Sequence, residues 1–285
     1  MLDDIYQTLD PIAFTLGPFT ARWYGIAYAL GFLLAATVIY FVGKRWKMSF
    51  DLNSLCTVII CAMVGVILGG RLGYVLIYNN AFYAANPFEI LNFSNGGMSF
   101  HGGLIGALLA GIIAARLIKM PYLSLVDVAI IGVPIGLFFG RCANFVNGEL
   151  WGAPTDLPWG VVFGGSAGIV PRHPSQLYEA LLEGLVLFVI LYAMSFKKPP
   201  FSRGSYIGTF LLGYGIFRFL VEFIRQPDVQ IGYLFGDWFT MGQLLSLPLI
   251  VIGIILLIYA CVKKRPQVGP HINEAEEESH ETTVL

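Results

Sequence analysis

The sequence predicts an all-α integral membrane protein with seven transmembrane helices, interfacial N-terminal segments and a small cap on the outer side. Hydrophobic residues make up 56% of the 285 residues and charged residues only 12%, whereas roughly a quarter of a soluble domain is charged. The mean hydropathy is +0.72, and three charge-free stretches are long enough to cross a bilayer as helices. Such a chain is too apolar for a soluble globule.

The seven spans are expected at residues 23–43, 52–70, 102–115, 128–140, 184–196, 204–217 and 238–262. The first two and the last approach or exceed the roughly 20 residues that cross the hydrocarbon core. The other four are shorter between charges, and we expect polar residues that face protein rather than lipid to extend them. Because no basic residue precedes Arg22, the first span lacks the basic start of a cleaved signal peptide and is expected to stay in the protein.

The basic residues are distributed unevenly. Every lysine lies in the loops 44–51, 116–127 and 197–203 or in the tail from 263. By the positive-inside rule these segments face the cytoplasm, so the N-terminus is expected outside and the C-terminus inside. The basic residues that remain, on the outer side or within spans, are all arginines: Arg22, Arg71, Arg141, Arg172, Arg218 and Arg225.

These arginines predict an anion site in the outer half of the protein. Guanidinium is always charged and grips phosphate through two parallel hydrogen bonds. The alternative is that each arginine pairs with a carboxylate to hold the helices together, and it stays open, above all for Arg71. Arg22 and Arg172 are expected at the membrane interface, where long basic side chains reach water.

Two outer segments connect the spans. Residues 78–100 are rich in Pro, Asn and aromatics and are expected to lie along the membrane. Residues 145–175 predict the cap, with a short strand at 159–163 between turn-rich stretches. Within the cap, "GGSAG" fits a hydrolase nucleophile motif around Ser166, but prolines follow too closely for the helix that this motif requires.

The stretch "RHPSQLYEALLEG" predicts a helix that begins near Ser175. Glu179 and Glu183 then occupy its first turns, where carboxylates suit the helix dipole, so capping alone could explain them. Residues 266–285 have few apolar side chains and a run of acids, which predicts a disordered cytoplasmic tail after a membrane domain of residues 1–265. The cysteines form no CxxC pair and no arrangement typical of a metal site.

Polar residues that could carry chemistry gather at the outer ends of three predicted spans. At the third span, His101 precedes Gly102 and Gly103. Glycines let a ligand approach the backbone closely, and a helix N-terminus attracts an anion. The fourth span ends in "GRCANFVNGELWG", where Arg141 and Asn144 share a helix face and a turn at "NGE" would return Glu149 to that face.

The sixth span carries a polar stripe on an otherwise apolar helix. Tyr214, Arg218, Glu222 and Arg225 follow one another at helical spacing. Charge within a membrane is costly and by default functional, although Arg218 and Glu222 could form a purely structural pair. The three clusters together predict a site for a phosphate-bearing lipid, with His101 as the side chain whose type suits proton transfer near neutral pH.

Five motifs in this order, "RWYG", "HGGLIG", "GRCANFVNGELWG", "RHPSQLYEA" and "FRFLVEFIRQPD", closely resemble the bacterial prolipoprotein diacylglyceryl transferases. The resemblance implies an inner-membrane enzyme that moves the diacylglyceryl group of phosphatidylglycerol to the lipobox cysteine of a prolipoprotein and releases glycerol phosphate. The predicted outer cap would then be periplasmic. Membrane lipid and prolipoprotein signal peptides are the expected partners, with no nucleic acid, metal or cofactor.

The resemblance also implies site residues. Arg141 matches the family's signature arginine, which binds phosphatidylglycerol, and Arg218 matches its second key arginine. His101, Asn144, Glu149 and Tyr24 match the other motif positions. The expected catalytic residues are His101, Arg141, Arg218 and Glu149, and the expected substrate-binding residues are Arg141, Asn144, Tyr24, Gly102, Gly103, Gly152, Tyr214, Glu222 and Arg225.

The hypothesis for the mechanism is attack of a thiol on a glyceryl carbon. A thiol must lose its proton to attack well, so His101 is expected to act as general base while Arg141 and Arg218 neutralise the departing phosphate. Two other classes were weighed. A phosphatidyl transferase that uses metal-bound CDP-lipids would need several aspartates at helical spacing, which the spans lack. A lipid or anion transporter would use an arginine site equally well.

Overall fold

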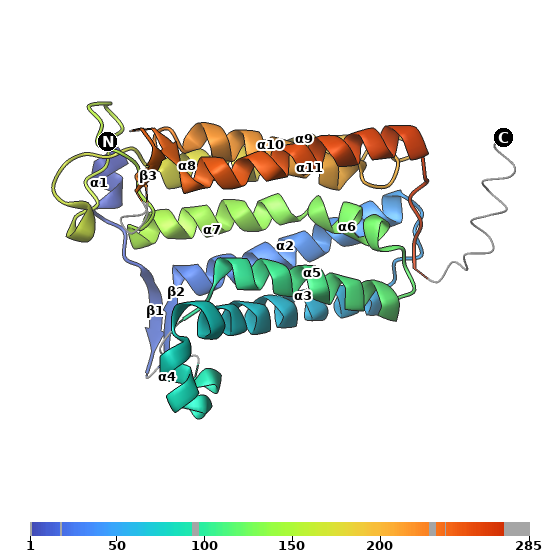
Figure 1. Ribbon diagram of the computed structural model, residues 1–285, viewed down its shortest axis with the longest axis horizontal. Helices are drawn as coiled ribbons and strands as arrows, with labels where there is room; N and C mark the ends of the chain where they lie inside the picture. The colour runs from blue at the N-terminus through green and yellow to red at the C-terminus, as the bar shows by residue number, and fades with distance from the viewer. Residues whose placement is uncertain (1, 18, 93–96, 228–231, 237, 271–285) are drawn as a thin grey trace, which may run out of the picture. The chain divides into compact units, whose positions relative to one another are not determined.

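The computed structural model describes residues 2–17, 19–92, 97–227, 232–236 and 238–270. These residues are mostly helical (Figure 1) and fall into two compact units. Unit 1 comprises Met1–Val42 and Asp127–Gln267, and unit 2 comprises Gly43–Val126 and Val268–Leu285. The helices α2 and α6 each cross the boundary between these ranges.

The helices of unit 1, including those that begin or end in it, are α1 (Leu2–Tyr6), α2 (Trp23–Arg45), α6 (Tyr122–Ile130), α7 (Val133–Asn147), the 3-10 turn η3 (Gly165–Ala167), α8 (Ser175–Glu179), the π-helix η4 (Ala180–Val186), α9 (Leu187–Met194), α10 (Ser205–Val221) and α11 (Met241–Lys263). Those of unit 2 are α3 (Leu52–Gly73), the π-helix η1 (Tyr74–Tyr78), α4 (Asn80–Ala85), the 3-10 helix η2 (Pro87–Leu91) and α5 (Phe100–Leu117).

Helix length decides how many spans the structure supports. Among the described residues, four continuous helical stretches are long and apolar enough to cross a membrane: Trp23–Arg45, Leu52–Tyr78, Ser175–Met194 and Met241–Lys263. The pair α6 and α7, bent by 45°, brings the number to five if it forms one broken span. The apolar helices α5 and α10 are shorter. Helices make up most of each of the seven predicted segments, although residues 131–132 break the fourth and β4 occupies the start of the seventh. The count of seven spans stays a prediction.

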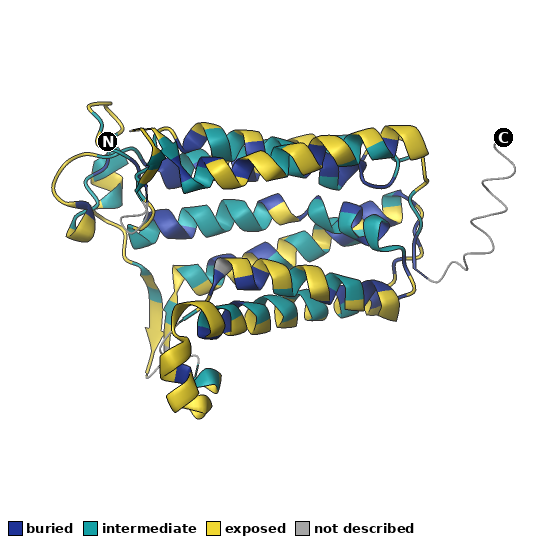
Figure 2. Cartoon of the chain, viewed as in Figure 1, coloured by how far each residue is buried: buried dark blue, intermediate teal, exposed yellow. Residues whose placement is uncertain are grey.

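The long helices expose apolar side chains over much of their circumference, as Figure 2 shows for α3, α5 and α11. At most 33% of any span-length window is buried inside the protein. A helix that is apolar all round and yet unburied in water would be unstable, but in a bilayer the lipid covers it. The chain is therefore a multi-pass membrane protein.

Local sequence signals explain where the unit 1 helices begin and end. Pro134 stands in the first turn of α7, where its missing N–H is harmless, and Gly148 ends the helix at φ +66°. The helix α8 begins at Ser175, directly after Pro174, as predicted. The helix α11 begins with a capping box between Thr240 and Gln243 and lies beside α10 (Figure 1).

Small sheets and short helices complete the described chain and were not predicted. Two antiparallel hairpins pair β1 (Ile12–Leu16) with β2 (Phe19–Arg22) and β3 (Tyr233–Phe235) with β4 (Phe239–Thr240). The strand predicted at 159–163 is wrong, because only Val161 pairs there, in a single bridge to Arg172. A turn closed by Gly160 inside this stretch and the glycines Gly164 and Gly165 directly after it leave too few residues for a ladder.

The first residues of the predicted disordered tail are held by hydrogen bonds. Residues 271–285 lie outside the described residues. Before them, the Pro266 carbonyl accepts a hydrogen bond of 2.6 Å from Arg203, and the Gln267 side chain donates to Asp127 at 2.7 Å and to the Phe201 carbonyl at 3.1 Å. Residues 266 and 267 are therefore bonded to unit 1.

Candidate functional site

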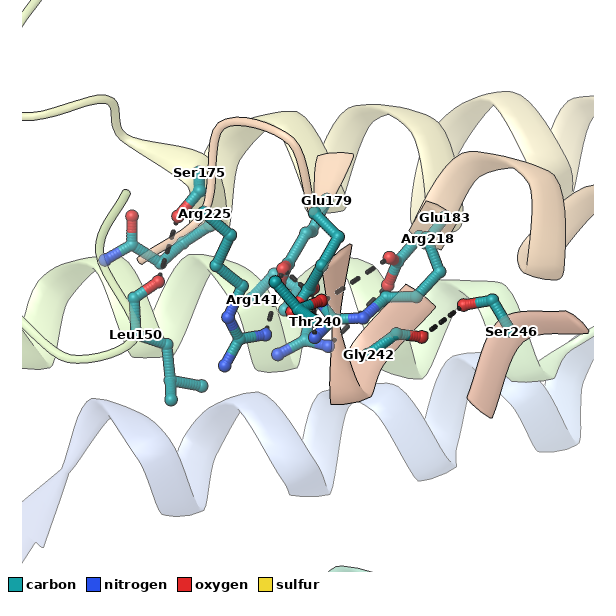
Figure 3. A network of polar contacts seen from close by, with 12 residues as sticks. Arg141, Leu150, Ser175, Glu179, Glu183, Arg218, Arg225, Thr240, Gly242 and Ser246 are labelled. Atoms are coloured by element: carbon teal, nitrogen blue, oxygen red, sulfur yellow. Dashed lines mark hydrogen bonds and ion pairs between the residues drawn. The ribbon is translucent and has the colours of Figure 1, made fainter. Parts of the chain in front are cut away.

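Six charged side chains of unit 1 form one cluster, drawn in part in Figure 3, that we call the Arg–Glu cluster: Arg141, Glu179, Glu183, Arg218, Glu222 and Arg225. Arg141 comes from α7, the first two glutamates come from α8 and η4, and the remaining residues come from α10 and the turn after it. The three arginines were predicted to converge, and the structure brings them together.

Glu179 lies at the centre of the cluster. Its Oε2 pairs with Arg141 Nε at 2.8 Å. Its Oε1 accepts a short hydrogen bond from Arg218 Nη1 and one of 3.2 Å from Arg225 Nη1. One carboxylate therefore binds all three guanidinium groups.

The other two glutamates bind fewer arginines. Glu183 lies 3.6 Å from Arg141 Nη2 and 4.0 Å from Arg218 Nη1, and neither of its oxygens makes a hydrogen bond within the described chain. Glu222 pairs with Arg218 Nη2 at 3.0 Å, one helical turn apart, and lies against Gly242 in the first turn of α11. The predicted Arg218–Glu222 pair is thus confirmed.

Burial separates the two kinds of charge. The side chains of Glu179 and Glu183 are 0% exposed, whereas those of Arg141, Arg218 and Arg225 keep 17%, 15% and 10% of their surface. Each arginine side chain of the cluster keeps more accessible surface than any of its three glutamates, because Glu222 retains 6% and the other two none. The three glutamates balance the formal charge of the three arginines.

A π-helix lies between the two buried glutamates. Regular α-helix ends at Glu179, and η4 begins at Ala180 and includes Glu183. A π-helical turn inside an α-helix is rare. Where such turns occur, they are often found at functional sites. Gly184 lies so close to Phe138 of α7 that an added Cβ would stand 2.7 Å from the Phe138 side chain. This close approach brings the glutamates within reach of Arg141.

Capping does not account for Glu179 and Glu183. Both point into the Arg–Glu cluster, so they are functional candidates that the sequence analysis missed. Two carboxylates four residues apart in the otherwise uncharged run "LYEALLEGL" are the signal that could have found them, because a membrane segment rarely tolerates two acids without partners. Tyr214 interacts electrostatically with the same cluster, as its place on α10 predicted.

A second polar group lies one turn further along α7. The Asn144 amide donates to Glu149 Oε1 at 2.7 Å, and the Tyr24 hydroxyl of α2 interacts with both residues. The chain turns back at Gly148, as "NGE" predicted, and Glu149 N donates to the Asn144 carbonyl at 3.1 Å. The predicted neighbourhood of Asn144 and Glu149 is confirmed.

The start of α8 holds this turn in place. Leu150 adopts φ +61°, which is strained for a branched side chain. The Ser175 hydroxyl donates to its carbonyl at 2.9 Å (Figure 3), and the Gln176 amide donates to the Glu149 carbonyl at 2.6 Å. The helix that carries Glu179 therefore also positions Glu149.

Backbone pairing around Gly152 positions Arg225. Gly152 bridges Arg225, and its N–H donates to the His173 carbonyl at 2.9 Å. A Cβ on Gly152 would stand 2.6 Å from both His173 Cβ and the Ile224 carbonyl, so close packing explains this glycine. The prediction that Arg225 continues the helical stripe is wrong, because α10 ends at Val221. Arg225 reaches the cluster from the turn that follows.

Arg172 makes several contacts within unit 1, and its predicted place at the membrane interface stays a prediction. Its guanidinium lies 4.2 Å from the centre of the Trp151 ring, and its Nε donates to the Ala167 carbonyl at 2.8 Å. Arg71 in unit 2 donates to three carbonyls between Glu89 and Asn92 and lies over the Tyr83 ring. Both arginines hold loops together rather than contributing to the Arg–Glu cluster.

His101, Gly102 and Gly103 belong to unit 2, and their part in the site stays a prediction. His101 is exposed near the N-terminus of α5, where Ser99 caps the helix by accepting from Gly102 N at 3.2 Å. Gly102 packs against α3: an added Cβ would stand 2.3 Å from the Gly69 carbonyl oxygen. Helix packing alone thus explains why Gly102 is a glycine. No group of His, Cys, Asp or Glu side chains suited to a metal occurs in the described ranges.

The fold and site define a class, namely a multi-pass helical membrane protein with a buried cluster of paired arginines and glutamates. The family described as prolipoprotein diacylglyceryl transferase matches residues 11–259, and this chain belongs to it. The chain is 47% identical over 265 residues to the phosphatidylglycerol–prolipoprotein diacylglyceryl transferase of Geobacter sulfurreducens, covering 93% of this chain and 99% of that protein. The proteins of the same name from Methylococcus capsulatus and Nitratidesulfovibrio vulgaris are each 48% identical, covering 91% and 88% of this chain and 98% and 95% of those proteins.

Proposed function

We propose that this protein transfers the diacylglyceryl group of phosphatidylglycerol to the lipobox cysteine of prolipoproteins, the first step of lipoprotein maturation. Family membership supports the activity. The observation in the structure that carries it is the convergence of Arg141, Arg218 and Arg225, each of which keeps some accessible side-chain surface. Such a group suits the phosphate of an anionic lipid.

The reaction exchanges one bond for another. The cysteine sulfur forms a thioether bond to a glyceryl carbon, and the bond from that carbon to a phosphate oxygen breaks. The thiol proton passes to a base, for which His101 is the candidate. The phosphate oxygen takes the electron pair, so glycerol phosphate leaves with more negative charge than the phosphodiester carried.

Arg141 and Arg218 stabilise that developing charge, because fixed guanidinium groups need no rearrangement when the bond breaks. Arg225 adds a third donor beside them. Asn144, Glu149 and Tyr24 form a hydrogen-bonding group that would orient the glycerol hydroxyls. Gly102, Gly103, Gly152, Tyr214 and Glu222 complete the proposed substrate-binding set.

We place the protein in the bacterial inner membrane with seven spans, a periplasmic N-terminus and a cytoplasmic C-terminus. The lysine-bearing loops support this orientation. Residues 1–265 would form the catalytic domain, residues 145–175 its periplasmic cap and residues 266–285 a cytoplasmic tail. Phosphatidylglycerol reaches the arginines from the outer leaflet in this arrangement.

Purified full-length protein given phosphatidylglycerol vesicles and a lipobox peptide tests the proposal. The expected product is peptide whose cysteine carries diacylglycerol as a thioether, detected by mass spectrometry, together with glycerol phosphate. Phosphatidylethanolamine vesicles with the same acyl chains are the matched control and should give little product. Movement of lipid or phosphate across vesicles without any thioether would instead indicate a transporter.

A further inference from the structure

We propose that Glu179 is the positioning residue of the reaction: it aligns Arg141, Arg218 and Arg225 so that their free N–H groups meet the substrate phosphate. The inference rests on the proposed function and assigns a role to a carboxylate whose place in the sequence helix capping alone could have explained. Glu179 acts through the arginines and does not itself touch substrate.

The first argument is the number of partners. Three guanidinium groups from α7, α10 and the turn after α10 converge on this one carboxylate. Three positive charges that contact the same carboxylate repel one another strongly where water is scarce. The Glu179 carboxylate between them offsets part of the repulsion, and its contacts fix each fork relative to the other two. Without it, the three side chains would move apart.

The second argument is the place of the carboxylate. Glu179 is fully buried, whereas each of its arginine partners retains exposed surface. In this inference the incoming phosphate contacts the arginines, which keep accessible surface, and leaves the fully buried glutamate in place. Glu179 remains behind the arginines during the reaction, where it holds their orientation.

The third argument is the contrast with Glu183, which is equally buried on the same helical stretch. Glu183 reaches its nearest guanidinium nitrogens only at 3.6 and 4.0 Å and makes no hydrogen bond among the described residues. Glu179, in contrast, accepts hydrogen bonds from Arg218 and Arg225 and forms a 2.8 Å ion pair with Arg141, although this ion pair lacks the geometry of a hydrogen bond. Orientation requires short, directed contacts. The positioning role therefore belongs to Glu179, and Glu183 provides a matched comparison one turn away.

The test compares Glu179→Gln with Glu183→Gln in the full-length protein, with phosphatidylglycerol and lipobox peptide as substrates. Both changes replace one fully buried carboxyl group with an amide and keep the side-chain shape. We expect Glu179→Gln to lower kcat/KM by about 100-fold or more and Glu183→Gln by about tenfold or less. Glu179→Asp keeps the carboxylate on a side chain that is one methylene shorter. Its kcat/KM should be at least about tenfold higher than that of Glu179→Gln.

Equal losses for the two glutamine variants would overturn the inference, because the effect would then follow from removing any buried charge. Glu179→Gln activity within about threefold of wild type would overturn it as well. If Glu179→Gln fails to fold, as judged by its thermal unfolding midpoint, the Glu179→Asp variant serves as the test. Undiminished activity of Glu179→Asp would contradict a positioning role. A loss of activity of about tenfold, with an unfolding midpoint equal to that of wild type, would support it.

A binding measurement separates this inference from the proposed function. Glycerol phosphate should raise the unfolding temperature of wild type and of Glu183→Gln but not that of Glu179→Gln. If wild type makes no thioether product, the proposed function fails, yet the loss of this stabilisation in Glu179→Gln would still support the inference. Equal stabilisation of all three proteins would overturn it.

Discussion

At the scale of single residues, the shape of a charged group matters as much as its sign. Arg141 pairs through Nε with Glu179 at 2.8 Å, while its Nη2 lies 3.6 Å from Glu183. A planar fork can pair with a glutamate on one edge and still present N–H groups to a phosphate on another. A compact ammonium group cannot do both.

Replacing Arg141 with Lys therefore keeps the charge and removes the fork. We expect kcat/KM to fall by about 100-fold, measured with phosphatidylglycerol and a lipobox peptide. Arg22→Lys makes the same change at an exposed position at the end of β2 and should leave activity near wild type. Near-normal activity of Arg141→Lys would contradict bidentate phosphate binding.

The proposed base can be tested through the pH dependence of the rate. Replacing His101 with Gln should abolish the rise of kcat/KM on the acid side, because no imidazole remains to take the thiol proton. His173→Gln is the control: the His173 ring lies beside the Tyr178 hydroxyl and is not the proposed base, so the acid limb should remain in this variant. An unchanged pH profile in His101→Gln would remove His101 as the base.

At the scale of elements, glycines decide which helices touch. The helices α3 and α5 pack so closely that a Cβ on Gly106 would stand 2.0 Å from the Gly65 carbonyl oxygen. Small residues at such spacing let backbones approach in a membrane, where dispersion contacts replace the hydrophobic effect.

Replacing Gly106 with Ala should accordingly lower the thermal unfolding midpoint by several degrees, since the backbones must separate. Gly103→Ala adds the same methyl group at a position where the nearest atom is 3.5 Å away, and it should leave the midpoint nearly unchanged. A comparable loss of stability in both variants would indicate that helix propensity, rather than packing, sets the effect.

The start of α10 depends on a distant carboxylate. Its N-cap is Gly204, which has no side chain to cap the helix. Asp127 of α6 replaces the cap: its carboxylate accepts from Gly204 N at 2.6 Å, from Ile207 N at 2.9 Å and from the Gln267 side chain at 2.7 Å. A negative group is also favoured at a helix N-terminus.

Replacing Asp127 with Ala leaves these buried donors without an acceptor and should cost about 3 kcal/mol or more of stability. The measurement is thermal or denaturant unfolding in detergent. Asp156→Ala, at an exposed position in the segment before η3, should have little effect. An unchanged midpoint in Asp127→Ala would show that the α10 N-terminus is held by other contacts.

At the scale of the whole molecule, the distribution of charge predicts orientation. Lysines are confined to one set of loops, and the Arg–Glu cluster belongs to the helix ends of the other side. The enzyme would thus meet its prolipoprotein on the outer surface, where signal peptides emerge from the bilayer.

Single cysteines test this orientation after the four native cysteines have been replaced by Ala or Ser. In intact spheroplasts, a membrane-impermeant maleimide should label Asp156→Cys, and it should label Lys198→Cys only after permeabilisation. Both positions are exposed in the fold, so access to the reagent depends on the membrane. Labelling in the opposite order would reverse the topology.

The helical membrane fold, the seven apolar segments and the convergence of Arg141 with Arg218 could be predicted from the sequence, because hydrophobicity and the cost of intramembrane charge act locally along the chain. The turn that returns Glu149 to Asn144 could be predicted as well, because glycine favours that backbone conformation. The tertiary structure alone decided that Glu179 binds three arginines, that Arg225 reaches them from beyond α10, and that Gly102 and Gly152 are close-packing positions. These contacts join segments far apart in the chain, and sequence spacing carries no information about which distant groups a folded backbone brings together.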